Sequence, residues 1–307
     1  MTHTHTHSHF GEIARQTSTR LAIALVITLA FVAVEAAAGW YANSLALLSD
    51  AGHNLTDVFA LALSWVAIWL SQRPSSARHT YGFHRAGILA ALINSLTLIL
   101  MAVWIFYEAY QRLIYPPEMQ PGVLVVVGAL ALAVNLGTAL LLKRGSDQDL
   151  NLRSAFVHLM GDVFSTAGAI LAGVVILFTG WYWLDALVSI LIGGLILWNA
   201  WKILRETLDI LLESTPRDVD LERLVADLRA VEGVRGVHDL HVWSINQTLR
   251  TLSAHIVTDD QAISAGAALQ RGLNELLVHQ YGIAHATLQL ECADCLPNCA
   301  YGTITQN

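Results

Sequence analysis

The feature that most restricts the fold of this chain is a series of long apolar runs. They lie near residues 19–41, 45–71, 87–110, 121–142, 155–178 and 181–201. Each approaches or exceeds the roughly 20 residues that an α-helix needs to cross the hydrocarbon core of a bilayer. Only 13% of the 307 residues are charged, against roughly 25% in an ordinary soluble domain. We therefore predict an all-α membrane domain of six transmembrane helices.

Basic residues at the ends of these runs predict the orientation of the chain. With six spans, ten of them fall on the side of the N-terminus, and only Arg112 falls on the other side. The ten are Arg15, Arg20, Arg73, Arg78, Arg85, Lys143, Arg144, Arg153, Lys202 and Arg205. By the positive-inside rule, we expect both termini to be cytoplasmic. The connection between the fourth and fifth runs is short and has no His-rich loop, which indicates a bacterial inner membrane.

Composition divides the chain into four segments. Residues 1–18 form a tail with alternating His and Thr, which cannot build a core and is expected to collect metal ions weakly through His3, His5, His7 and His9. Residues 19–205 contain the apolar runs, and residues 206–291 return to a soluble mixture of helix-like and strand-like runs that predicts a small α+β domain. The helix-like runs are 217–231 and 261–281, and the strand-like runs are 235–244, 249–258 and 284–291. Residues 292–307 form a tail that holds all three cysteines.

The overall charge excludes one class of partner. The formal net charge is −7, and no basic surface suited to neutralising phosphates is evident. We therefore expect the bilayer to be a partner and do not expect nucleic acid.

Two of the apolar runs contain the same polar pair, His-x-x-x-Asp. The pairs are His53 with Asp57 in the second run, and His158 with Asp162 in the fifth. A spacing of four residues places both side chains on one face of a helix. Two such helices facing each other would supply two imidazole nitrogens and two carboxylate oxygens, a set that suits tetrahedral Zn²⁺. Mg²⁺ and Ca²⁺ prefer oxygen ligands alone.

The same two pairs are compatible with several alternatives. The four groups could be core polar residues that hydrogen-bond between helices, or one buried ion pair in each helix. An ionisable group at membrane depth costs a few kcal/mol, and a divalent cation would compensate all four groups at once. A membrane metal hydrolase would need an open coordination position, which four protein ligands would fill. A metal sensor or channel would bind ions without coupled transport.

Four stretches of the sequence occur in the order found in one transporter family. ANSLALLSDAGHNLTD, YGFHRAGILAALIN, HLMGD and VHDLHVW resemble signatures of the cation diffusion facilitators. The resemblance implies efflux of Zn²⁺ from the cytoplasm by a homodimer, in exchange for protons. It implies a transport site at His53, Asp57, His158 and Asp162, with His53 favouring zinc over cadmium. Efflux of a broader set of ions, such as Cd²⁺, Co²⁺ and Fe²⁺, stays open.

The ligand types explain why metal and proton fluxes would be coupled. A histidine near its reference pKa of about 6.5 binds either a proton or a metal ion through the same nitrogen. Competition between the two then links their movements. Rocking of helices around a site near the midplane would expose it to each side in turn, as in other secondary transporters. We therefore expect a proton antiporter with alternating access and not an enzyme.

A second metal site is expected in the C-terminal domain, for which the resemblance implies a ferredoxin-like fold. The resemblance places zinc ligands at His238 and His255, one on each of two adjacent strands. Glu291, Cys292 and Cys295 follow the last strand, and Cys-x-x-Cys can act as a thiolate clamp. The alternative is that both histidines are ordinary surface residues.

Four further polar residues bear on these sites. Asp50 lies three residues before His53, where it could guide ions or hydrogen-bond to a ligand. His79 and His84 lie in the connection after the second run, where some bacterial relatives hold a metal, but they could equally be interfacial histidines. His241 is expected on the strand face opposite His238, because side chains alternate along a strand.

Overall fold

The computed structural model describes residue 26 and residues 29–146 and 150–292. The chain divides into two compact units, which are treated separately. The helical unit comprises Met1–Leu63 and Ile93–Lys202, and the C-terminal unit comprises Ser64–Leu92 and Ile203–Asn307. Three long helices run from one unit into the other, so the units do not coincide with the segments expected from composition.

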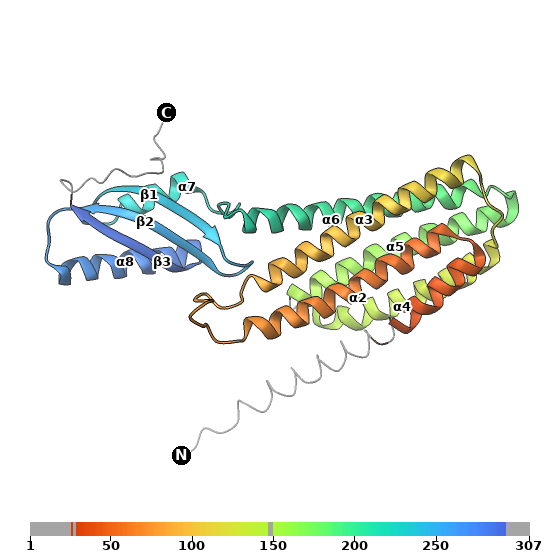
Figure 1. Ribbon diagram of the computed structural model, residues 1–307, viewed down its shortest axis with the longest axis horizontal. Helices are drawn as coiled ribbons and strands as arrows, with labels where there is room; N and C mark the ends of the chain where they lie inside the picture. Colours follow the sequence, from red (N-terminus) through yellow and green to blue (C-terminus); the bar gives the residue numbers. More distant parts are fainter. Residues whose placement is uncertain (1–25, 27–28, 147–149, 293–307) are drawn as a thin grey trace, which may run out of the picture. The chain divides into compact units, whose positions relative to one another are not determined.

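Long apolar helices form the membrane part of the chain (Figure 1). They are α2 (Leu45–Ser71), α3 (Ala86–Ile114), α4 (Pro121–Ser146), α5 (Leu150–Thr179) and α6 (Trp183–Leu211). All five contain a segment long and apolar enough to cross a membrane. The first predicted span begins outside the described residues, and its described part is a shorter apolar helix, Leu29–Ala42. Many large apolar side chains on these helices, such as Leu100, Phe164 and Trp198, are exposed, as expected for helices that face lipid.

Close packing of α4 against α5 depends on glycine. A Cβ atom at Gly128 would come within 2.9 Å of the Ile170 side chain, and one at Gly173 within 3.0 Å of Leu124. Small residues allow membrane helices to approach closely, because lipid supplies no hydrophobic force between them. A second apolar cluster joins α3 to α6 through successive turns of both helices. Its buried members are Leu98, Ala102, Ile105, Ile192, Ile196 and Ala200.

The first turn of α2 is held by an aspartate of another helix. Asp185 of α6 accepts hydrogen bonds from the Ser44 hydroxyl (2.7 Å), the Leu45 amide (2.7 Å) and the Ala46 amide (3.3 Å). The Ser44 hydroxyl caps the Leu47 amide locally, and the carboxylate satisfies the two amides before it, which have no partners within α2. Nη1 of Arg112 in α3 lies 3.9 Å from the same carboxylate. Three helices therefore meet at the start of α2.

The C-terminal unit contains a small α+β domain. Its elements are α7 (Leu221–Arg229), β1 (Val234–Ser244), β2 (Arg250–Thr258), α8 (Ile263–Tyr281) and β3 (Ile283–Cys292). The sheet order is β1-β2-β3, with β1 and β2 antiparallel and β2 and β3 parallel. The predicted fold class, apolar membrane helices followed by a small α+β domain, is confirmed.

One face of this sheet is covered by both helices. Leu224 and Leu228 of α7 and Leu273 and Leu277 of α8 form a single apolar core with the strands. The strand residues of that core are Val237, Val242, Leu252, Ala254, Ile256, Ile283 and Leu288. The side chains that alternate with them point away from the core, and these include the candidate ligands of the domain.

Candidate metal centres

The first group of candidate ligands lies between α2 and α5 in the helical unit. His53, Asp57 and Asp162 each offer one ligand atom, and these atoms all lie within 4.8 Å of one another. Nε2 of His53 is 3.8 Å from Oδ2 of Asp57 on the same helix, and 3.5 Å from Oδ1 of Asp162 on α5. The four-residue spacing thus places two ligands on one helical face, and packing of α2 against α5 adds the third.

Burial makes this group unusual. The side chains of His53 and Asp162 are 13% and 10% exposed, and that of Asp57 is 31% exposed. Two carboxylates beside one imidazole in an apolar surrounding carry negative charge that few solvent molecules can screen. A divalent cation bound by all three groups would compensate that charge. The residue types and the geometry therefore fit a metal ion.

The fourth predicted ligand of this group cannot be placed. His158 lies in α5, one helical turn before Asp162, but its side chain lies outside the described part of the chain. Its role as a ligand stays a prediction.

Asp50 takes part in a different set of contacts. Its Oδ2 accepts a hydrogen bond of 3.2 Å from the hydroxyl of Thr166 on α5. Its carboxyl group also interacts electrostatically with that of Glu35, which accepts a hydrogen bond of 3.3 Å from the Asn54 amide. Asp50 does not belong to the three-residue group around His53. These buried contacts join three helices next to that group.

The second group of candidate ligands lies on the open face of the C-terminal sheet. His238 of β1, His255 of β2 and Glu291 of β3 bring their ligand atoms within 4.8 Å of one another. Oε2 of Glu291 is 3.1 Å from Nε2 of His238, and Oε1 is 3.0 Å from Nδ1 of His255. The two imidazole rings meet edge to face at 5.1 Å. Three adjacent strands thus contribute one ligand each.

A β-bulge beside this group overturns one expectation. The register shifts between His238, opposite His255, and His241, opposite Ser253. Because residues 253 and 255 lie on the same face of β2, the bulge puts His238 and His241 on one face. His241 was expected on the opposite face, and that prediction is wrong. Strand alternation alone could not find the bulge.

The bulge also introduces a residue that sequence reasoning missed. Asp239 has a backbone φ of +50°, a conformation uncommon outside glycine, asparagine and aspartate. Its carboxylate lies 3.5 Å from Nε2 of His255 and 3.3 Å from Nε2 of His241. Asp239 therefore holds the far side of the His255 ring. The sequence did contain a signal for this contact, namely an aspartate placed between two histidines in the segment HDLH.

The remaining predicted ligands lie outside both groups. Cys292 is the last residue of β3 and is not one of the three clustered ligands, and Cys295 lies outside the described residues. His79 is in the loop after α2, where its ring packs against Phe83 at 4.4 Å. His84 is also in this loop, and neither histidine joins a cluster of three ligands within the described ranges. The N-terminal histidines precede the first described residue.

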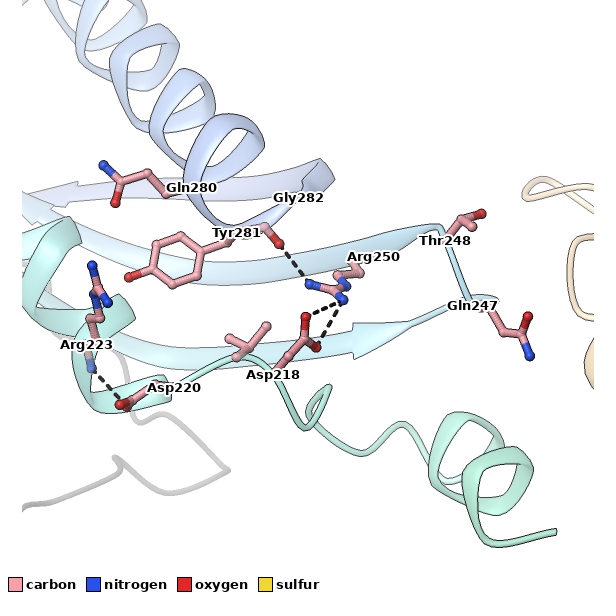
Figure 2. Close-up of a pocket in the computed structure, with 10 residues that line it drawn as sticks. Asp218, Asp220, Arg223, Gln247, Thr248, Arg250, Gln280, Tyr281 and Gly282 are labelled. Carbon is pink, nitrogen blue, oxygen red and sulfur yellow. Dashed lines mark hydrogen bonds and ion pairs between the residues drawn. The ribbon is translucent and has the colours of Figure 1, made fainter. Parts of the chain in front are cut away.

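A cavity of about 600 Å³ in the C-terminal unit has a different character (Figure 2). Both carboxylate oxygens of Asp218 accept hydrogen bonds from Arg250, at 3.0 and 2.7 Å, and this guanidinium also donates to the carbonyl of Tyr281. The bond from Arg250 holds the pKa of Asp218 below its usual range. Burial, together with a hydrogen bond to Asp227, raises the pKa of Tyr281 to about 12. The pair of Asp218 and Arg250 ties the segment before α7 to the sheet, and the pair of Tyr281 and Asp227 joins α8 to α7. Neither of the two ligand groups found among the described residues lies in this cavity.

Comparison with known proteins places the whole arrangement in a family. Residues 21–212 match the cation efflux transmembrane domain, and residues 216–293 match the cytoplasmic domain of cation efflux proteins. The chain is a cation diffusion facilitator. Members of this family are metal cation efflux transporters, so the predicted transporter class is confirmed and the hydrolase alternative is excluded.

Several relatives resemble this facilitator over nearly their full length. The cadmium, cobalt and zinc/H⁺-K⁺ antiporter of Bacillus subtilis is 38% identical over 88% of each chain. The metal cation efflux system protein CzcD of Cupriavidus metallidurans is 38% identical over 95% of this chain and 90% of its own. The zinc transporter ZitB of Escherichia coli is 35% identical over 97% and 95%. A solved structure, the metal-bound C-terminal domain of CzcD, is 32% identical and covers 24% of this chain and 99% of its own, with a TM-score of 0.22.

Proposed function

We propose that this facilitator exports Zn²⁺ from the cytoplasm in exchange for protons, through a site formed by His53, Asp57, His158 and Asp162. The observation that carries the proposal is the approach of His53 to two carboxylates on two different helices. One imidazole and two carboxylates already supply three of the four ligands that tetrahedral Zn²⁺ takes.

The direction of the two helices supports His158 as the fourth ligand. His53 meets Asp162, and Asp50 meets Thr166, so α2 and α5 run antiparallel along their contact. In that register, position 158 lies at the level of Asp57. An imidazole there would complete two His-Asp levels, one above the other, around a single ion.

Charge balance supports exchange with protons. With Zn²⁺ bound to two neutral histidines and two carboxylates, the site has a net charge of 2 − 2 = 0. With no metal and both histidines protonated, its net charge is again 2 − 2 = 0. Exchange of one Zn²⁺ for two protons therefore leaves the charge of the site unchanged and avoids a net charge at membrane depth. Histidine suits this role because its reference pKa is about 6.5.

The names of relatives support the substrates. ZitB is a zinc transporter, and the B. subtilis relative is a zinc/H⁺-K⁺ antiporter. The latter name also includes cadmium and cobalt, which favours a second candidate: efflux of several divalent cations through the same site. Co²⁺ and Zn²⁺ accept the same nitrogen and oxygen ligands.

The remaining parts of the chain have proposed roles around this site. We place the protein in a bacterial inner membrane with both termini in the cytoplasm, where it works as a homodimer by alternating access. Residues 19–205 form the transport domain, and residues 206–291 form the dimerisation domain. His238, His255 and Glu291 hold a regulatory metal ion, to which the tail from Cys292 to Cys295 contributes.

Transport by the purified protein in proteoliposomes tests this proposal. An imposed pH gradient is expected to drive Zn²⁺ uptake, detected with an internal zinc dye. His53→Ala removes a ligand and is expected to abolish uptake. His279→Ala is the control, because His279 is an exposed histidine of α8 outside both groups. Uptake that ignores the pH gradient, or that survives in His53→Ala, would rule out the proposed antiport.

A further inference from the structure

A second polar contact joins α2 to α5 beside the proposed transport site. The hydroxyl of Thr166 donates to Oδ2 of Asp50 over 3.2 Å. Both residues are buried, with Thr166 2% and Asp50 5% exposed. A hydrogen bond between helices in an apolar surrounding has few competing partners, so it can hold the two backbones at a fixed separation.

This contact is aligned with the ligand group. Asp50 precedes His53 by three residues, and Thr166 follows Asp162 by four. The two contacts between the helices therefore lie about one turn apart, roughly 5 Å along the helix axes. Figure 1 shows α2 and α5 side by side. A change in helix separation at one contact must be felt at the other.

Asp50 also has a neighbour on a third helix. Glu35, on the helix Leu29–Ala42, is fully buried, and its carboxyl group interacts electrostatically with that of Asp50. Asn54 of α2 donates to Oε2 of Glu35 over 3.3 Å. The bond from Thr166 therefore connects α5 to a turn of α2 that is itself joined to the helix Leu29–Ala42 through Asn54 and Glu35.

We propose that Thr166 is a positioning residue that determines ion preference, by setting the separation of α2 and α5 at the transport site. The inference rests on the proposed function of that site. Zn²⁺ binds nitrogen and oxygen ligands at about 2.0–2.2 Å, so a group of ligands held at a short separation favours it. A larger ion such as Cd²⁺ must push the two helices apart. The bond between Thr166 and Asp50 resists that displacement.

Substitutions at position 166 test the proposal in proteoliposomes. Thr166→Val removes the hydroxyl and keeps the branched shape, whereas Thr166→Ser keeps the hydroxyl. KM and maximal rate are measured for Zn²⁺ and Cd²⁺ side by side. In Thr166→Val the KM for Zn²⁺ is expected to rise roughly three- to tenfold, the range that one hydrogen bond between membrane helices can account for. The KM for Cd²⁺ is expected to rise less, and Thr166→Ser is expected to keep the wild-type ratio.

Thr138→Val is the matched control. Thr138 is a threonine of α4 whose hydroxyl donates to the carbonyl of Val134 in its own helix, over 2.8 Å, so its loss should leave the Zn²⁺/Cd²⁺ ratio unchanged. If Thr166→Val does not fold, Thr166→Ala, which lacks the hydroxyl, is compared with Thr166→Ser, which keeps it. An unchanged ratio in the variants that lack the hydroxyl, or an equal change in Thr166→Ser, would overturn the proposal. Absence of flux driven by the pH gradient in the wild type would instead count against the proposed function.

Discussion

The two groups of candidate ligands are alike in composition and different in scaffold. Each gathers histidine and carboxylate side chains within 4.8 Å. In the helical unit the ligands come from α2 and α5, whose backbones share no hydrogen bonds. In the C-terminal unit they come from three neighbouring strands whose backbones are joined by a continuous ladder. The same residue types are therefore held by side-chain packing in one place and by backbone pairing in the other.

This difference indicates how readily each group can be taken apart. Sliding or tilting α2 against α5 changes the distance from His53 to Asp162 without breaking any backbone hydrogen bond. Separating His238 from His255 requires the loss of ladder bonds between β1 and β2, each of which would leave unpaired polar groups. A site that must bind and release its ion in every cycle suits the first scaffold. A site that senses the ion without moving it suits the second.

The strongest test of the difference between the two groups is to remove Asp162, the candidate ligand that α5 contributes to the group on α2. Asp162→Ala is expected to lower Zn²⁺ flux at least about 100-fold, because even residues that only support a metal ligand are worth 10- to 100-fold. Zinc binding by the C-terminal unit, measured by calorimetry on the full-length protein, should persist. Loss of that binding as well would mean that the two groups do not act separately.

The reciprocal substitution is Glu291→Ala. It removes the only carboxylate of the C-terminal group of three, and it should weaken zinc binding there by roughly 10- to 100-fold. Flux driven by the pH gradient should remain, since the ligands between α2 and α5 are intact. Chelation of zinc should lower the unfolding temperature of the wild type by more than that of this variant, because only a bound ion adds to stability. A variant with no flux would assign the C-terminal group to transport itself.

Ion preference offers a finer test of the helical group. His53→Asp replaces a nitrogen ligand by oxygen and is expected to shift the ratio of Zn²⁺ to Cd²⁺ transport toward Cd²⁺ by about tenfold, equivalent to roughly 1.4 kcal/mol. The corresponding change in the C-terminal unit, His255→Asp, should leave the transport ratio unchanged. Flux of both ions is measured in the same vesicle preparation. Equal shifts in the two variants would show that preference is not set between α2 and α5.

The smallest expected effect concerns the pair of Asp218 and Arg250, which contains no metal ligand. Because the folded state holds the pKa of Asp218 below its usual value, the pair stabilises the fold above the unfolded pKa of about 3.9. That contribution is lost as the pH falls through the lower, folded pKa. Asp218 is 66% exposed, so Asp218→Asn should destabilise the protein by no more than about 0.5 kcal/mol at pH 7. Thermal unfolding should show this difference to be constant down to about pH 5 and to narrow below about pH 4. A difference in stability between the wild type and Asp218→Asn that grows as the pH falls would contradict this prediction.

Local patterns in the sequence predicted much of the fold. The strand-like runs 235–244 and 249–258 lie within one residue of β1 and β2 at each end. The apolar runs correspond to the long helices, because hydropathy over 20 residues leaves a helix few alternatives in a bilayer. Helix ends were less accurate: α6 continues to Leu211, ten residues past the apolar run. Its last turns mix charged and apolar residues, so hydropathy averaged over 20 residues gave no sign of them.

For the sites, the sequence predicted contacts between residues of the same helix or strand and missed contacts between residues of different elements. The pairing of His53 with Asp57 follows from helical spacing alone. The contact between Asp50 and Thr166 depends on how α2 packs against α5, and no spacing along either helix encodes it. Asp239 was missed, and His241 was placed on the wrong face, for a related reason: a single extra residue in β1 reverses the alternation of every side chain beyond it.

The carboxylate that caps α2 has a mechanical consequence. Asp185 ties the Leu45 end of this helix to α6 by accepting hydrogen bonds from a hydroxyl and two amides. That end is therefore the fulcrum about which the helix would rotate. At 1.5 Å per residue, His53 lies about 12 Å from the fulcrum, whereas the Ser71 end lies about 39 Å away. A rotation of α2 that moves the Ser71 end by about 6 Å would therefore displace His53 by only about 2 Å. A displacement of that size is comparable to the length of a bond between zinc and its ligand. It would be enough to separate His53 from an ion bound at the proposed transport site, while the Ser71 end of the helix moves much farther.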